Sequence, residues 1–174
     1  EQTVQQMKLT EFVREELDRE DERSRKALEN VTDGKYQWKP HERSMIFGYL
    51  ADMVATIPTW ITMEINRDDL DIAPAEGQGT KKAQKETRAE LIKALDESAA
   101  EARDALAKTT DEHLETKWKL LARGNVVWEG SRKEMIQDTI NHWVHHRGQM
   151  TVYLRLMGAK VPAIYGPSAD DRSF

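Results

Sequence analysis

Hydrophobic residues recur at intervals of three and four along most of this chain, which is the period of an amphipathic helix. The pattern predicts a first helix over residues 3–29 and a second over about 43–66. A third helix is predicted over about 81–108, and a fourth begins after Ser131 and ends at Gly158. Ser131 with a glutamate three residues later is a capping-box pattern, and glycine commonly ends helices. Helices therefore account for most of the chain.

Two interruptions break this helical pattern. Pro58 falls inside the second predicted helix, and we expect it to kink that helix or divide it in two, because proline removes a backbone hydrogen bond. Between residues 114 and 130 the helical period fails, and apolar residues on both sides of a turn at 123–125 predict a short two-stranded excursion. The polar connection at 68–80 is long enough to cross over the end of a helical bundle.

These elements predict an all-α fold, a four-helix bundle that forms one domain over residues 1–174. The formal net charge of −5 argues against a basic surface for nucleic acid. No apolar run approaches the roughly 20 residues that span a bilayer. The chain has no cysteine, which removes disulfides, thiolate ligands and a cysteine nucleophile together. We therefore expect a cytoplasmic protein that binds neither nucleic acid nor membranes.

Three of the five histidines fall within five consecutive positions of the fourth predicted helix. In a helix, His142 and His146 stack on one side, one turn apart, while His145 points in another direction. Two imidazoles at this spacing can hold one divalent metal ion without distorting the backbone. The same residues can equally cap a helix, form hydrogen bonds or line a polar gap in the core. The spacing alone leaves both interpretations open.

Polar residues accompany the histidines on the same side of the fourth helix. A purely structural helix carries Leu or Ile on its buried side, because an unpaired buried polar group costs about 1–3 kcal/mol. The side of the fourth helix that carries His142 has polar as well as apolar residues, and it therefore predicts a polar pocket inside the bundle. The residues that share the direction of His142 are Met135, Asp138, Gln149, Tyr153 and Leu156.

The first two predicted helices also carry polar positions within their apolar stripes. In the first helix, Glu20, Asp21 and Ser24 lie between apolar ends, so this side either faces the same pocket or forms the rim of an exposed surface. In the second helix, the stripe ends at a glutamate. Its members are Ile46, Tyr49, Leu50, Met53, Ile57, Trp60 and Glu64.

Two stretches of the chain carry recognisable family motifs. The first comprises residues 141–149 (NHWVHHRGQ), followed by Tyr153-Leu154-Arg155-Leu156 and by residues 162–170 (PAIYGPSAD). The second comprises residues 38–45 (WKPHERSM), with Gly48, Leu50 and Ala51 after it. These stretches resemble the DinB family, and the likeness covers nearly the whole chain.

The resemblance implies an up-down-down-up bundle, often paired as a homodimer, with a divalent metal ion (commonly zinc or nickel) held by three histidines. Carried over to this chain, His142 and His146 match the two ligands of the fourth helix, and the ligand of the second helix falls on Met53. Some members of the family are thiol-dependent transferases or isomerases that use bacillithiol or mycothiol. The side chains expected to line the pocket or to orient ligands and substrate are Asp138, Gln149, Tyr153 and Glu20.

Met53 in place of the family's histidine leaves three hypotheses. A thioether suits Cu(I) and binds Zn²⁺ or Ni²⁺ weakly, although Glu20, Asp21 and Asp138 are carboxylates that could complete a divalent site. The first hypothesis is a metal-dependent enzyme, a hydrolase or a thiol transferase, acting on a small molecule or a thiol. The second is a bundle without the metal that serves as a small-molecule binding or structural domain. The third is a Cu(I) or haem site that includes Met53.

Overall fold

The structure is a computed structural model that describes residues 6–76 and 84–174. Helices make up most of the described structure, and the second predicted helix is divided into α2 and α3. The helices are α1 (Leu9–Leu28), α2 (Phe47–Thr56), α3 (Pro58–Asn66), α4 (Arg88–Lys108), the short α5 (Asp111–Leu114) and α6 (Arg132–Leu156). The strands are β1 (Asp69–Asp71), β2 (Lys117–Ala122) and β3 (Asn125–Ser131).

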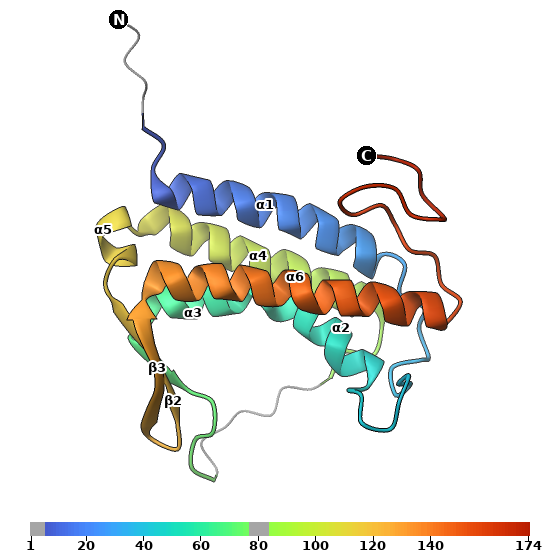
Figure 1. Ribbon diagram of the computed structural model, residues 1–174, viewed down its shortest axis with the longest axis horizontal. Helices are drawn as coiled ribbons and strands as arrows, with labels where there is room; N and C mark the ends of the chain where they lie inside the picture. Colours follow the sequence, from blue (N-terminus) through green and yellow to red (C-terminus); the bar gives the residue numbers. More distant parts are fainter. Residues whose placement is uncertain (1–5, 77–83) are drawn as a thin grey trace, which may run out of the picture.

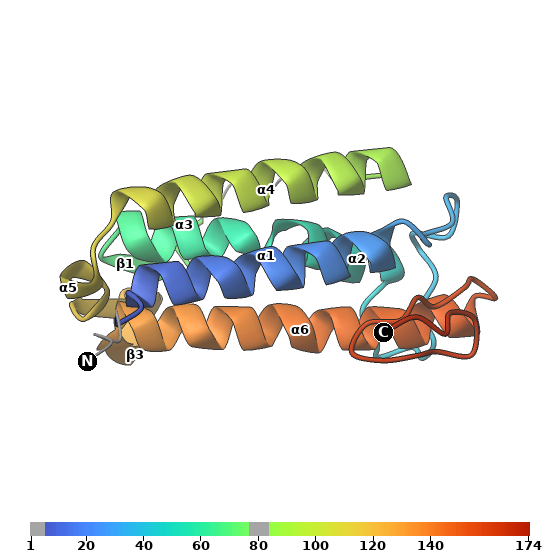
Figure 2. The same cartoon turned by 90° about the horizontal axis from the view of Figure 1, so that it is seen from above.

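The long helices lie side by side around one apolar core. Helices α4 and α6 each pack against α1, α2 and α3. Figure 2 shows α4 and α6 along the two sides of the molecule, with the other helices between them. The strands and α5 gather at one end, and the C-terminal segment lies at the other (Figure 1). No helix in the described ranges has the length and apolar character needed to cross a bilayer.

The helix starts differ from the sequence prediction where a cap decides them. Helix α1 begins at Leu9 rather than at residue 3, because the carboxylate of Asp111 accepts hydrogen bonds from the first free backbone N–H groups, those of Leu9 and Thr10, at 2.9 Å each. Residues 3–5 lie outside the described ranges. Helix α4 begins at Arg88 rather than at residue 81, because Thr87 caps it in a reciprocal pair with Glu90. Residues 81–83 also lie outside the described ranges.

Pro58 divides the second predicted helix, as expected. Helix α2 ends at Thr56, and α3 begins with Pro58 in its first turn. Proline is tolerated there because the first backbone N–H groups of a helix have no partner within it. The break allows α2 and α3 to follow the surfaces of α4 and α6 as two separate segments.

The predicted capping box at the start of α6 is present. The hydroxyl of Ser131 accepts a hydrogen bond from the backbone N–H of Glu134, and the carboxylate of Glu134 accepts one from the backbone N–H of Ser131 at 2.8 Å. This cap fixes the start of the helix that carries the histidines.

Replacing Ser131 by alanine removes one half of this cap, so we expect it to lower the free energy of unfolding by about 1 kcal/mol. Ser131→Thr, which keeps an acceptor hydroxyl, is expected to lose much less. Urea denaturation of both variants measures the difference. Equal losses in the two variants would show that the hydroxyl does not stabilise the helix.

The predicted two-stranded excursion before α6 is present as β2 and β3, but the sheet also contains β1, so the fold is not purely α-helical as predicted. Strands β2 and β3 pair antiparallel, and β1 pairs parallel with β2. Strand β1 comes from the connection that the sequence pattern assigned to a polar crossover. Its three residues are too few to show an alternation, and its pairing partner lies about 50 residues later. The carboxylate of Asp71 joins the strands by accepting hydrogen bonds from the backbone N–H groups of Arg123 and Gly124.

Candidate histidine site

His142 and His146 face each other on successive turns of α6. Their Nε2 atoms lie 2.7 Å apart, a hydrogen-bond distance, and the ring centroids are 4.5 Å apart. His146 is buried at 7% exposure, whereas His142 is more exposed. The ring of His145, on an exposed position of the helix, lies 5.3 Å from the ring of His146. The helix therefore directs two ring nitrogens to one point, as the spacing predicted.

Gln149 selects the tautomer of His146. The Nδ1 atom of His146 lies 2.8 Å from the side-chain oxygen of Gln149, which can only accept a hydrogen bond. With the amide in this orientation, a neutral His146 carries its proton on Nδ1 and keeps the Nε2 lone pair free. His142 then donates from its own Nε2 to that lone pair. Gln149 thus orients the second imidazole and prepares its outer nitrogen to accept a proton or a metal ion.

The ring of Trp60 on α3 covers one side of His142. The two ring centroids are 5.1 Å apart, and the planes meet edge to face at 83°. Partial burial lowers the pKa of His142 below its ordinary value of 6.5, and the neighbouring rings of His146 and His145 lower it further. A neutral imidazole at neutral pH is the form that binds metal ions.

The other residues predicted for the site have different surroundings, and not all of them lie next to the histidine pair. Met53 on α2 is partly buried and packs against the apolar core. Asp138 is exposed on α6, one turn before His142, and lines a groove of about 440 Å³ together with Phe12 and Trp128. Of the four residues expected to line or orient the site, all of which lie in the described ranges, Gln149 forms a hydrogen bond with a site histidine and the others do not.

Glu20 is buried, but its partners are not the histidines. Its carboxylate bonds to Arg147 at 2.5 Å and to Arg23 at 2.7 Å, and it accepts hydrogen bonds from the hydroxyl of Tyr165 at 2.8 and 2.9 Å. Arg147 follows His146 in the sequence and leaves the helix in another direction, toward α1. Glu20 therefore belongs to a separate ion-pair cluster.

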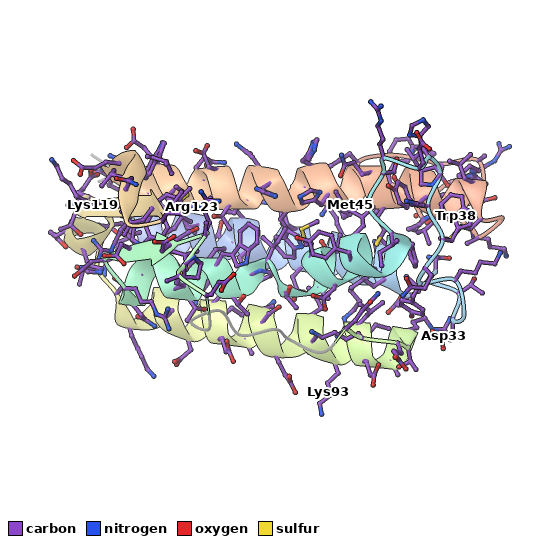
Figure 3. The ribbon with its side chains drawn as sticks, turned by 90° about the horizontal axis from the view of Figure 1, so that it is seen from below. Asp33, Trp38, Met45, Lys93, Lys119 and Arg123 are labelled. Carbon is purple, nitrogen blue, oxygen red and sulfur yellow. The ribbon has the colours of Figure 1, made fainter. Side chains whose placement is uncertain are left out.

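Tyr153 lies two turns beyond His146 on α6. Its hydroxyl donates a hydrogen bond to the backbone oxygen of Met45 at 3.1 Å, and its ring meets that of Trp38 edge to face at 5.6 Å. Figure 3 places Met45 and Trp38 toward the end of the molecule opposite Lys119 of the sheet. Tyr153 thus links the segment that precedes α2 to α6.

One polar contact beside the site was not predicted from the sequence. Glu64 on α3 is buried, and its Oε1 accepts a hydrogen bond from the hydroxyl of Thr139 on α6. The available signal was the position of Glu64 at the end of an otherwise apolar stripe. The stripe alone could not show its partner, because Thr139 lies 75 residues away in the sequence.

The donor set of the site is two imidazoles. Within residues 6–76 and 84–174, no three His, Cys, Asp or Glu side chains come close enough together to hold one metal ion. Catalytic zinc sites usually have three protein ligands and one open position. His142 and His146, through their convergent Nε2 atoms, are the residues that could hold a metal ion here.

Long helices packed side by side, with a hydrogen-bonded histidine pair on the last of them, define a helical protein. A sequence model of the DinB family matches residues 6–172. The chain belongs to the DinB family. This assignment agrees with the resemblance carried by residues 38–45 and 141–149.

Solved structures of DinB-like proteins share the fold. A DinB-like protein from Bacillus cereus ATCC 10987 superposes with a TM-score of 0.70 at 24% identity, over 89% of this chain and 97% of that chain. The DinB-like protein YjoA from Bacillus subtilis gives a TM-score of 0.66 at 17% identity, over 92% of this chain and 99% of that chain. A DinB-family structure from Exiguobacterium sibiricum 255-15 gives 0.58 at 15% identity, over 87% and 93%.

Among curated proteins, YrdA of Bacillus subtilis (strain 168) is 49% identical over 37 residues. The matched segment is 21% of this chain and 22% of YrdA. It therefore relates a short part of the two chains.

Proposed function

We propose that this DinB-family protein binds a divalent metal ion, zinc or nickel, between His142 and His146. The observation that carries the proposal is the 2.7 Å approach of their Nε2 atoms, with His146 held in place by Gln149. His142 and His146 would hold the metal ion through these two nitrogens. Met53 would leave the position of the family's third histidine without a strong ligand for either metal.

The proposed activity is that of a metal-dependent hydrolase or thiol transferase. When bound, the metal ion would lower the pKa of a water or thiol ligand so that it becomes a nucleophile near neutral pH. The contribution of this chain is positional. Gln149 orients His146, and the ring of Trp60 limits the access of water to one side of His142.

A second candidate function is a bundle that binds small molecules, or acts as a structural domain, without a metal. The observation that favours it is the hydrogen bond between the two imidazoles, which satisfies both nitrogens without an ion. In the part of the chain that the structure describes, the two imidazoles have no third His, Cys, Asp or Glu side chain close enough to share a metal ion, which is consistent with this alternative.

The family resemblance extends the proposal to architecture and assembly. We infer an up-down-down-up four-helix bundle in which α2 and α3 together form one helix. The opposite chain directions of α1 and α6 against α3 and α4 in Figure 1 support this inference. We also propose a homodimer in the cytoplasm. Light scattering after size-exclusion chromatography tests the dimer.

Metal analysis separates the two functions. We expect protein purified without a histidine tag to bind zinc or nickel with micromolar or tighter affinity, and His146→Ala to lose this binding, because it removes the better oriented of the two ligands. Mass spectrometry of the purified protein and calorimetric titration measure the metal content and the affinity.

Met53→His is the matched comparison. If the wild type binds neither metal while Met53→His binds strongly, the site has lost its metal and the second function stands. A thiol-transfer assay with bacillithiol then tests activity in whichever form binds the metal.

A further inference from the structure

A carboxyl group lies buried between α3 and α6, close to the histidine site. Glu64 is 2% exposed. Its Oε1 accepts the hydrogen bond of Thr139, and its Oε2 has no hydrogen-bond partner within the described part of the chain. An ionised carboxylate loses its hydration in such a place and, among residues 6–76 and 84–174, gains no cation as a partner. The surroundings therefore favour the neutral, protonated form.

Few charged groups face Glu64 from the elements that pack against α3. Asp138 on α6 is the charged neighbour that acts on it, and Thr139 supplies its hydrogen bond. The buried residues of α2 and α4 include no charged side chain. Burial is the main cause that raises the pKa of Glu64 to about 8, and the negative charge of Asp138 raises it further, while the Thr139 hydrogen bond lowers it. The carboxyl group thus holds a proton at pH 7.

Glu64 and the histidine pair lie along one helix–helix interface, at successive turns. On α3, Trp60 precedes Glu64 by one turn and contacts His142. On α6, Thr139 precedes His142 by three residues. A point midway between the two histidines is five residues beyond Thr139, or about 7.5 Å along the helix axis. At this distance a carboxyl group is not a ligand, but it experiences the charge of an ion at the site.

We propose that Glu64 is the proton-exchanging partner of the histidine site: a divalent cation bound by His142 and His146 expels the proton of Glu64, and release of the cation restores it. The O–H bond of the carboxyl group breaks, its electron pair stays on the carboxylate, and the proton passes to solvent. The resulting negative charge offsets one of the two positive charges of the ion. This inference rests on the proposed metal binding and adds a pH dependence to it.

The size of the effect follows from the distance. With the axial offset taken as the separation, a doubly charged ion about 8 Å from the carboxyl group, at an effective dielectric constant of about 20, lowers its pKa by about three pH units. Starting from about 8, the group then ionises below pH 7. Between about pH 6 and 8, zinc affinity is therefore expected to rise by up to tenfold per pH unit more in the wild type than in Glu64→Gln.

Calorimetry with zinc chloride tests this coupling. The wild type and Glu64→Gln are titrated at pH 7 in two buffers with different ionisation enthalpies, which gives the number of protons released per zinc ion. We expect about one more proton from the wild type. Glu15→Gln, which changes an exposed carboxyl group on α1, should release as many protons as the wild type. Protons released by the histidines cancel, because all three proteins keep them.

The same pair of titrations is made in the Met53→His background, so that the test does not depend on the affinity of the native site. Equal proton counts with and without Glu64 overturn the coupling and leave metal binding intact. If the wild type takes up no zinc, the metal proposal fails for the native chain, and the Met53→His pair decides the coupling: an additional proton from Glu64 supports it and an equal count refutes it. Absence of zinc uptake in both backgrounds overturns both proposals.

Discussion

Glu64→Gln is expected to become more stable than the wild type as the pH rises from 5 to 8.5. The pKa of Glu64 is raised from its ordinary value of 4.5 to about 8 in the folded protein. The folded chain therefore holds a proton that the unfolded chain has lost, and the free energy of unfolding falls with pH in this range. Each pH unit between the two pKa values corresponds to about 1.4 kcal/mol. The whole interval corresponds to about 5 kcal/mol, all of it lost above pH 8.

Urea denaturation of both proteins at intervals of one pH unit measures this effect. The informative quantity is the difference between the two free energies of unfolding, because the titration of all other groups cancels in it. Glu15→Gln, the control at an exposed position, should differ from the wild type by the same amount at every pH. A Glu64→Gln difference that stays constant from pH 5 to 9 would show that this carboxyl group has an ordinary pKa in the folded protein.

Arg147→Met is expected to lower the free energy of unfolding by about 3–5 kcal/mol. Arg147 is 1% exposed and Glu20 is 2% exposed, and their atoms lie 2.5 Å apart. Arg147 also donates a hydrogen bond to the hydroxyl of Tyr165 at 2.6 Å. Removal of one member of a buried pair leaves the charge of the other without its main partner, which costs far more than the net contribution of the intact pair.

Two comparisons test the origin of this loss by urea denaturation. Arg23→Met removes the second arginine from Glu20, but Arg23 is 28% exposed in its side chain, so the expected loss is below that of Arg147→Met. The double variant Glu20→Leu with Arg147→Met removes both buried charges and should recover much of the stability. A double variant that is less stable than Arg147→Met alone would contradict this explanation.

The sequence pattern predicted the long helices because their apolar faces repeat with the helical period. It also predicted the division at Pro58 and the cap at Ser131, since both depend on residues adjacent in the chain. It did not predict β1, whose three residues form a strand only when β2 lies beside them. The start of α1 was also missed, because its cap is the carboxylate of Asp111, about 100 residues later.

The sequence likewise predicted only part of the candidate site. His142, His146 and Gln149 lie within two turns of one helix, so their spacing was sufficient to bring them together. Glu20 is a polar residue within an apolar stripe, which is why the sequence predicted that it lines the pocket. In the structure its partner is Arg147. The stripe shows that a side chain is turned inward, but it does not show which other helix it meets.

By itself, the sequence determined the helical character of the chain, its DinB resemblance and the pairing of two imidazoles, because these depend on residue types and on spacings within a few turns. The tertiary structure decided which polar side chains meet across helices: Glu20 with Arg147, and Glu64 with Thr139. It also decided that Glu64 is buried with no cationic partner among the described residues, and therefore that its carboxyl group keeps a proton at neutral pH. Such properties depend on the hydration and charge around a group, which are fixed only when distant segments pack together.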